Sequence, residues 1–199
     1  MNTQARPAIV RAFPIILALL FITACNNEDK KPGSDKEGFF PVVGFILAQV
    51  QHVDTSVYPI MKITFIDSAH TDTTYIKRED FAAAAQDFLT LPDIFMPEYA
   101  SRYKEVNGFD GTLNRGFLLY TPVNPDKEII QDQKVLIKPD PSGDKPSTII
   151  VNTYQNTKDS VVEKQLTWWV DRSFLVTKTT QLPGKPEVTT NFKVIWNEE

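Results

Sequence analysis

Apolar positions change their spacing along this chain, from a helical period in the first half to alternation in the second. Between residues 39 and 53 they recur about one helical turn apart, and Pro41 suits a first turn, so the pattern predicts an amphipathic helix. The stripe of that helix consists of Val43, Ile46, Leu47 and Val50. A second helix is predicted over residues 78–91, where the alanine run has high helix propensity. Its stripe consists of Phe81, Ala84, Ala85 and Phe88.

Runs of alternating apolar and polar residues predict β-strands joined by short turns. A first hairpin is expected from strands over residues 57–66 and 73–77, with a turn at 67–72. Between the hairpin and the second half, residues 97–104 are expected to form a short helical turn, and Asn107-Gly108 and Asp110-Gly111 to form chain reversals. The later strands are predicted at residues 116–123, 134–138, 147–157, 161–170, 174–182 and 187–197.

Short links between long strands are typical of an antiparallel meander. In the last strand, alternate positions place one set of side chains on a single face, which predicts one dry and one wet face. That set is Val188, Thr190, Phe192, Val194 and Trp196. The sequence therefore predicts one α+β domain over residues 39–199. It should contain an antiparallel sheet, either open or strongly curved as far as a half-barrel, with two or three helices from the N-terminal half packed on one face.

The first 24 residues have the pattern of an export signal, with a basic start and an apolar run over residues 12–22 that is too short to span a membrane. The sequence Ile22-Thr23-Ala24-Cys25 then resembles the lipobox of bacterial lipoproteins. This resemblance implies cleavage before Cys25, diacylglycerol on its thiol, and acylation of the new amino group by a fatty acid such as palmitate. The alternative is a free or buried thiol. Cys25 is the only cysteine in the chain and cannot form an internal disulfide, which favours lipidation over that alternative.

Residues 25–38 contain no apolar side chain after the cysteine and are expected to be a flexible tether. Asn26 directly after the cysteine resembles lipoproteins sent to the outer membrane. The acidic pair Glu28-Asp29 resembles the surface-export signals of Bacteroidota lipoproteins. We therefore expect a lipid anchor in the outer membrane, with the periplasmic face and the cell surface both open as locations.

The charge of the mature chain excludes some partners. Residues 1–24 hold two of the 21 basic residues and none of the 25 acidic ones, so their removal would leave a net charge of −6. Such a balance argues against nucleic acid, which favours a basic face, and against polybasic docking onto anionic lipid. No cofactor motif is found.

Trp168 and Trp169 are adjacent on a predicted strand, so their rings should point to opposite faces. One should join the core, and the other should meet a helix or lie exposed. An exposed indole would be a platform on which a sugar or another flat ligand stacks. The alternative interpretation is that both rings are buried between sheet and helices.

Candidate sites for metals and catalysis are sparse. Asp67, His70 and Asp72 share a predicted turn, but turns contain such residues anyway, and the loop from Asp140 to Asp144 lacks the oxygen spacing of a calcium loop. We therefore predict no metal site. No hydrolase, phosphate-loop or dinucleotide motif is present, and no catalytic residue is predicted.

Three short segments resemble the O-glycosylation signal of Bacteroidota envelope proteins. They lie in or beside predicted turns. The acceptor residues would be Ser68, Thr73 and Ser160.

The C-terminal half resembles the carriers and receptors of the Lol lipoprotein-sorting pathway over about thirty residues. The shared elements are the strand end Trp168-Trp-Val-Asp171, a strand that ends at Leu182-Pro-Gly, and the last strand from Thr190 to Asn197. In that family such strands form an unclosed barrel around an acyl-chain cavity. Three functions follow as hypotheses: a non-enzymatic binding or assembly module with a protein or glycan partner, a carrier of acyl chains or another apolar ligand, and a hydrolase with dispersed acidic residues.

Overall fold

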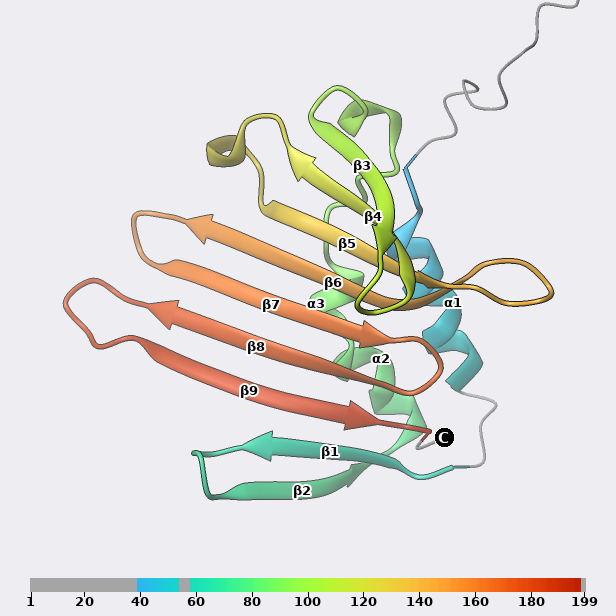
Figure 1. Cartoon of the computed structure of the whole chain (residues 1–199). Coiled ribbons are helices and arrows are strands. Elements are labelled where there is room, and N and C mark those ends of the chain that lie inside the picture. Colours follow the sequence, from blue (N-terminus) through green and yellow to red (C-terminus); the bar gives the residue numbers. More distant parts are fainter. Residues whose placement is uncertain (1–38, 54–57, 198–199) are drawn as a thin grey trace, which may run out of the picture. The chain divides into compact units, whose positions relative to one another are not determined.

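The computed structural model describes residues 39–53 and 58–197. The predicted signal peptide (1–24), the tether (25–38) with Cys25, and the predicted strand start at Val57 lie outside the described residues. A nine-stranded antiparallel sheet forms most of the rest (Figure 1). Its strands are β1 (Ile60–Phe65), β2 (Thr71–Ile76), β3 (Tyr103–Asp110), β4 (Arg115–Pro122), β5 (Ile130–Lys138), β6 (Lys145–Asn156), β7 (Val161–Trp169), β8 (Ser173–Gln181) and β9 (Val188–Ile195).

The strand order is β2-β1-β9-β8-β7-β6-β5-β4-β3. From β3 to β9 each strand pairs with the next along the chain, as a meander does. The early β1–β2 hairpin joins the sheet beside β9, the last strand. The sheet is open, with β2 and β3 as its edges, and the predicted α+β fold with an antiparallel meander is confirmed.

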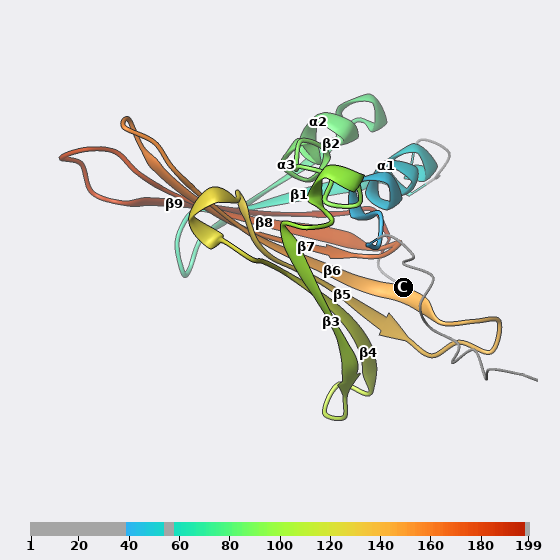
Figure 2. The same cartoon turned by 90° about the horizontal axis from the view of Figure 1, so that it is seen from above.

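The helices lie on one face of the sheet (Figure 2). Helix α1 (Val42–Val53) buries a stripe at a spacing of about four residues: Val42, Ile46, Val50 and Val53. The predicted stripe was wrong at Leu47, which is 45% exposed, because the helix turns that position away from the sheet.

The second predicted helix is interrupted at Ala85. A 3₁₀ turn, η2 (Arg78–Asp80), leads into α2 (Phe81–Ala84), and α3 (Gln86–Leu89) follows the break. The predicted apolar stripe still holds, since Phe81, Ala85 and Phe88 are buried against the sheet. Two further 3₁₀ turns, η3 (Pro97–Tyr99) and η4 (Pro125–Lys127), lie in the loops that flank β3 and β4.

An aromatic cluster fills the space between the helices and the sheet. Trp168 stacks on Phe174 with ring centroids 5.2 Å apart, and Phe88 meets Trp168 edge-on at 5.2 Å. Phe81 packs against Trp196 at 5.1 Å. Large buried rings of this kind contribute most to a core, because their truncation typically costs ~3–5 kcal/mol.

The predicted dry face of β9 is confirmed only at the end that the helices cover. Val194 and Trp196 are buried and Phe192 is half-buried. Val188 is 58% exposed, and Thr190 is also exposed, because this end of the strand runs out past the helices (Figure 1).

Strand β3 was missed by the sequence prediction. Asn107 and Gly108 are not a turn: within β3 they pair with Leu118 and Phe117 of β4. Gly108 is compatible with a strand here because Phe117 needs its space, and a Cβ at position 108 would lie 2.8 Å from the Cζ atom of that ring. The turn predicted at Asp110-Gly111 is confirmed, since β3 ends at Asp110.

No described helix is long and apolar enough to cross a membrane.

Candidate functional site

The sheet face turned away from the helices, here called the outer face, has no described helix over it (Figure 2). Strand register places one residue of each strand in a row across this face. The row consists of Gly108, Phe117, Leu136, Thr148, Trp169, Ser173, Ile195, Met61 and Tyr75. The row runs from edge to edge of the sheet.

A second row lies directly beside the first. It consists of Val106, Leu119, Lys134, Ile150, Thr167, Leu175, Lys193, Ile63 and Thr73. We call the two rows together the outer band. Ile150, Thr167 and Leu175 at its centre are only half-buried. The outer band is therefore a mostly apolar surface that spans the sheet without a described covering element.

The two lysines of the outer band lie over aromatic rings of its first row. The Nζ atom of Lys134 is 5.1 Å from the ring centroid of Phe117, and that of Lys193 is 5.3 Å from the ring of Trp169. Both distances are within the range of cation–π attraction. These lysines bring positive charge into a mostly apolar surface.

The row on the far side of the second row consists of polar side chains at its centre. Asn152, Gln165, Thr177 and Asn191 are register partners there. The amide of Asn152 donates to both carboxylate oxygens of Asp132, at 2.9 and 3.0 Å. The outer band therefore has a polar border on this side.

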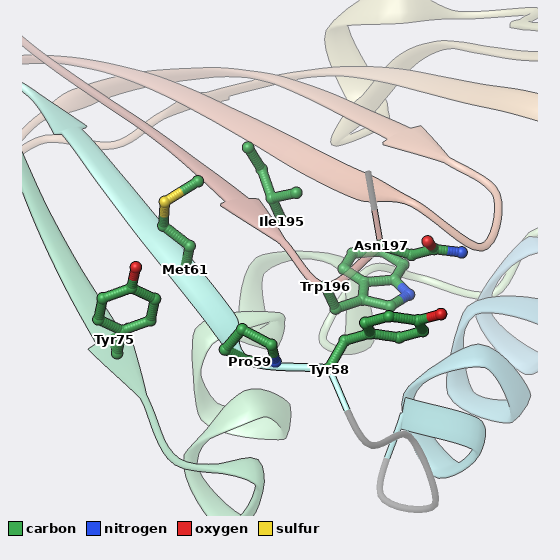
Figure 3. Close-up of a pocket in the computed structure, with 7 residues that line it drawn as sticks. All are labelled: Tyr58, Pro59, Met61, Tyr75, Ile195, Trp196 and Asn197. Atoms are coloured by element: carbon green, nitrogen blue, oxygen red, sulfur yellow. The ribbon is translucent and has the colours of Figure 1, made fainter. Parts of the chain in front are cut away.

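A pocket of about 350 Å³ lies at the β2 end of the outer band (Figure 3). Its lining residues are Tyr58, Pro59, Met61, Tyr75, Ile195, Trp196 and Asn197. Figure 3 shows Met61 and Tyr75 on the neighbouring strands β1 and β2, with Trp196 and Asn197 just beyond the end of β9. The lining is aromatic and aliphatic apart from Asn197, and none of its side chains is charged.

A larger pocket, of about 610 Å³, lies at the rim of the sheet beside Trp169, which is on the central strand β7. We call it the Trp169 pocket. It is formed by the ends of β4 to β7, the β7–β8 turn and helix α1. A register shift between β5 and β6 lies inside it, where Ser147 is an extra residue whose hydroxyl donates to the backbone oxygen of Leu136 at 3.1 Å. Bulges of this kind commonly redirect side chains at binding sites.

The Trp169 pocket is rich in cations. Arg115, Lys138, Lys145 and Arg172 line it, whereas Asp171 is its one acidic lining residue. Lys145 forms an ion pair with Asp140 at 3.2 Å. The other three cations make no ion pair with any described residue. In a chain of net negative charge, this is a local reversal of sign.

The β7–β8 turn that carries Arg172 is tied to helix α1. Asp171 has a φ of 59°, which is uncommon for a residue other than glycine, and its backbone N–H donates to the side-chain oxygen of Gln49 at 2.9 Å. This hydrogen bond fixes one wall of the Trp169 pocket against the helix.

The two adjacent tryptophans predicted as stacking candidates lie on opposite faces. Trp168 is fully buried in the aromatic cluster, and its Nε1–H has no partner among the described residues. Trp169 is half-buried on the outer face. Of the pair, only Trp169 is placed where an external ligand would reach it.

The predicted turn at residues 67–72 holds an exposed contact between a carboxylate and an imidazole. The Oδ1 atom of Asp67 accepts the backbone N–H groups of Ala69 and His70, and His70 Nδ1 lies 2.8 Å from Oδ2. The backbone of Ala69, followed by the side chain of His70, lowers the pKa of Asp67 below its usual value. Within the described residues, no group of three His, Cys, Asp or Glu is arranged to hold a metal.

The three residues predicted as glycan acceptors lie in different settings. Ser68 is exposed in the turn between β1 and β2, and Thr73 is exposed on the edge strand β2. Ser160 is half-buried, and its Oγ atom lies 3.4 Å from that of Thr157.

One polar cluster gave no signal in the sequence. Arg102 donates two hydrogen bonds to Glu128, at 2.7 and 2.6 Å, and its guanidinium lies 4.4 Å from the ring centroid of Tyr99. Burial, followed by the charge of Glu128, raises the pKa of Tyr103, whose hydroxyl donates to the same carboxylate. These groups come from η3, the turn that follows it, β3 and the loop before β5, so spacing along the chain could not reveal them. Their contacts hold the ends of these strands together.

No family model, curated protein or solved structure matches this chain. The function is therefore argued from the geometry of the outer face.

Proposed function

We propose that this chain is a lipid-anchored envelope protein whose domain is a non-enzymatic binding module, and that it binds a macromolecular partner through the outer band. The observation that carries the proposal is the register of the band. Two adjacent rows of mostly apolar, half-buried side chains cross all nine strands on a face that no described helix covers. Contiguous apolar surface of this kind is typical of interaction sites.

Packing on the opposite face supports a binding module over a carrier. An acyl-chain carrier needs an apolar cavity between sheet and helices. Here that space is occupied by Phe81, Phe88, Trp168 and Phe174, whose rings are in mutual contact and fully buried. The two pockets beside the outer band lie at the rim of the sheet instead. The carrier remains the alternative hypothesis.

The sequence supports the anchor and the compartment. The export signal and the lipobox at Cys25 resemble those of outer-membrane lipoproteins. Two or more acyl chains hold a protein on a membrane stably. A tether of 14 residues, numbers 25–38, would then place the binding face in the solution beside the membrane.

Photo-crosslinking in bacterial cells that produce the full chain tests the proposal. A diazirine amino acid replaces Leu175 at the centre of the outer band, and in a parallel strain it replaces Leu47, which is exposed on α1. We expect a discrete cross-linked species from position 175 and none from position 47. No species from position 175, or the same species from both positions, would contradict the proposal.

A matched pair of substitutions tests whether binding depends on the outer band or on the rest of the outer face. Thr167 pairs with Leu175 inside the band, whereas Thr179 lies on the same face in the polar region. Thr167→Arg should abolish the cross-link from position 175, because it puts a charge in the apolar centre. Thr179→Arg should leave it unchanged. Circular dichroism of both variants verifies that the fold is retained.

A further inference from the structure

We infer that the Trp169 pocket binds an anionic saccharide, that is, a sugar chain bearing carboxylate, sulfate or phosphate groups. This inference rests on the proposed binding function and assigns a ligand class to the rim pocket beside the middle of the outer band. Three observations carry it: the shape and lining of the pocket, its unpaired cations, and the contacts that hold its walls in place.

The pocket has the size and the mixed lining that a short saccharide requires. Its volume of about 610 Å³ lies within the usual range of ligand pockets, ~300–1,000 Å³. Trp169 offers an aromatic face, Leu136 adds apolar surface beside it, and Thr148 is the direct register partner of both. Sugar rings present apolar C–H faces that pack on aromatic side chains, while their hydroxyl groups hydrogen-bond to polar neighbours.

The charge of the pocket selects for an anion. Arg115, Lys138 and Arg172 line it without an ion-pair partner among the described residues. A guanidinium group binds carboxylate or phosphate through two parallel hydrogen bonds, which makes arginine the usual residue for such recognition. A neutral sugar would leave these charges without a counter-charge.

The walls of the pocket are held before any ligand arrives. Gln49 fixes the turn at Asp171, next to Arg172, and the Ser147 hydroxyl fixes the register shift between β5 and β6. The ammonium group of Lys193 lies over the indole of Trp169 and restricts that ring on one side. Binding to such a preformed site orders few side chains, which favours affinity.

The distribution of charge favours a saccharide over a flat anionic membrane. A membrane surface attracts clusters of basic residues spread over a face. Here the acidic Asp140, Asp144 and Asp171 stand in or beside the same loops as the cations, so the positive charge is confined to the pocket. A concave site of this kind fits a discrete ligand.

Binding to defined probes tests the inference with the mature protein in detergent. Isothermal titration would use polygalacturonate and dextran sulfate as soluble anionic chains, and lipopolysaccharide as a glycolipid with phosphorylated sugars. Neutral dextran and phosphatidylglycerol vesicles are the negative probes. We expect binding of at least one anionic sugar and of neither negative probe. Binding should weaken about tenfold or more as salt rises from about 0.05 M to about 0.5 M, because the attraction is screened. Which of these anionic probes bind then shows whether the ligand is a soluble sugar chain or a glycolipid.

Substitutions place the ligand in the pocket. Arg172→Ala and Trp169→Ala should each weaken binding about tenfold or more, since each removes a charge-assisted hydrogen bond or the stacking surface. Lys185→Ala removes an exposed cation in the β8–β9 loop, and Tyr154→Ala removes an exposed ring of β6 outside the outer band, so both should bind normally.

The inference would be overturned if no anionic sugar binds, or if the pocket variants bind as well as the controls. Equal binding to phosphatidylglycerol vesicles would overturn it too, in favour of a membrane surface. The cross-link from position 175 is independent of these titrations. If it persists while sugar binding fails, the saccharide assignment is wrong and the binding module stands. If it is lost while sugar binding holds, the band proposal is the one that fails.

Discussion

Gln49 of helix α1 accepts a hydrogen bond of 2.9 Å from the backbone N–H of Asp171, 122 positions later in the chain. Asp171 is the residue with left-handed backbone in the β7–β8 turn. The helix packs on one face of the sheet, yet Gln49 lines the Trp169 pocket, which extends around the rim to Trp169 on the outer face. The two faces of the sheet are therefore mechanically connected at this rim.

Removing the Gln49 side chain should affect the pocket more than the fold. Gln49→Ala should lower the unfolding free energy by only ~1 kcal/mol, because one half-exposed hydrogen bond is lost. Asp171→Gly should be neutral or stabilising, since glycine adopts a positive φ readily. Chemical denaturation measures both, and hydrogen exchange of the Arg172 amide should accelerate in Gln49→Ala alone. Equal exchange in both variants would show that the bond does not hold the turn.

The adjacent tryptophans give a matched comparison of core and surface. Trp168→Ala should lower the unfolding free energy by ~3–5 kcal/mol, because it empties the centre of the aromatic cluster. Trp169→Ala should cost much less, because that ring is half-exposed on the outer face. Urea unfolding of the two variants checks this. A similar loss in both would mean that Trp169 is also a core residue.

Gln133 is a polar residue that the core does not accommodate well. It is 1% exposed, and its Nε2 group has no hydrogen-bond partner among the described residues. An unsatisfied buried polar group costs ~1–3 kcal/mol. Gln133→Met, of similar volume, should therefore raise the midpoint of thermal unfolding. A fall in the midpoint would show that the amide is satisfied in solution.

The carboxyl group of Asp140 should titrate at unusually low pH. A hydrogen bond from the Ser142 hydroxyl, followed by the Ser142 backbone and Lys145, lowers its pKa from 3.8 to about 2. Because the folded pKa is depressed, the stabilisation is present above the unfolded value of 3.8 and is lost as pH falls toward about 2. NMR titration of the carboxyl carbon measures the midpoint. In Ser142→Ala the midpoint of the Asp140 carboxyl group should move back toward 3.8. An unchanged midpoint would show that Ser142 does not cause the low pKa.

Cys25 should determine where the protein resides. Cys25→Ser should block incorporation of a fatty-acid probe and leave the signal peptide uncut by the lipoprotein signal peptidase, because the thiol is the lipidated group in the resembled family. Labelling of cells with an alkyne-tagged fatty acid, followed by gel analysis, reads both effects. Equal labelling of mutant and wild type would refute the anchor.

Much of the fold was predictable because its strands alternate strictly and its turns are short. The strand from Val161 to Trp169 and its return from Ser173 were both read from period and turn chemistry. β3 was not, because its glycine follows asparagine and mimics a turn, and only the facing Phe117 reveals the reason. The exposure of Val188 also depends on where the helices end, which alternation does not encode.

The candidate site was predictable in one residue and not in its surroundings. Trp168 and Trp169 were correctly predicted to lie on opposite faces, because successive side chains of a strand alternate between faces. Nothing along the sequence indicated that Arg115, Lys138 and Arg172 would meet around the second indole, because they come from three different parts of the meander. The outer band likewise depends on the register of nine strands, which no single segment specifies.

The pairing of β1 with β9 also has a consequence for biosynthesis. The hairpin that begins at Ile60 has no neighbour to join until the strand that ends at Ile195 has been made, so the sheet is completed only after almost the whole chain exists. A chain released by the ribosome before Val188 would expose the edges of both β8 and β1, and open edges of this kind recruit other chains. The last strand therefore makes completion of the sheet depend on completion of translation.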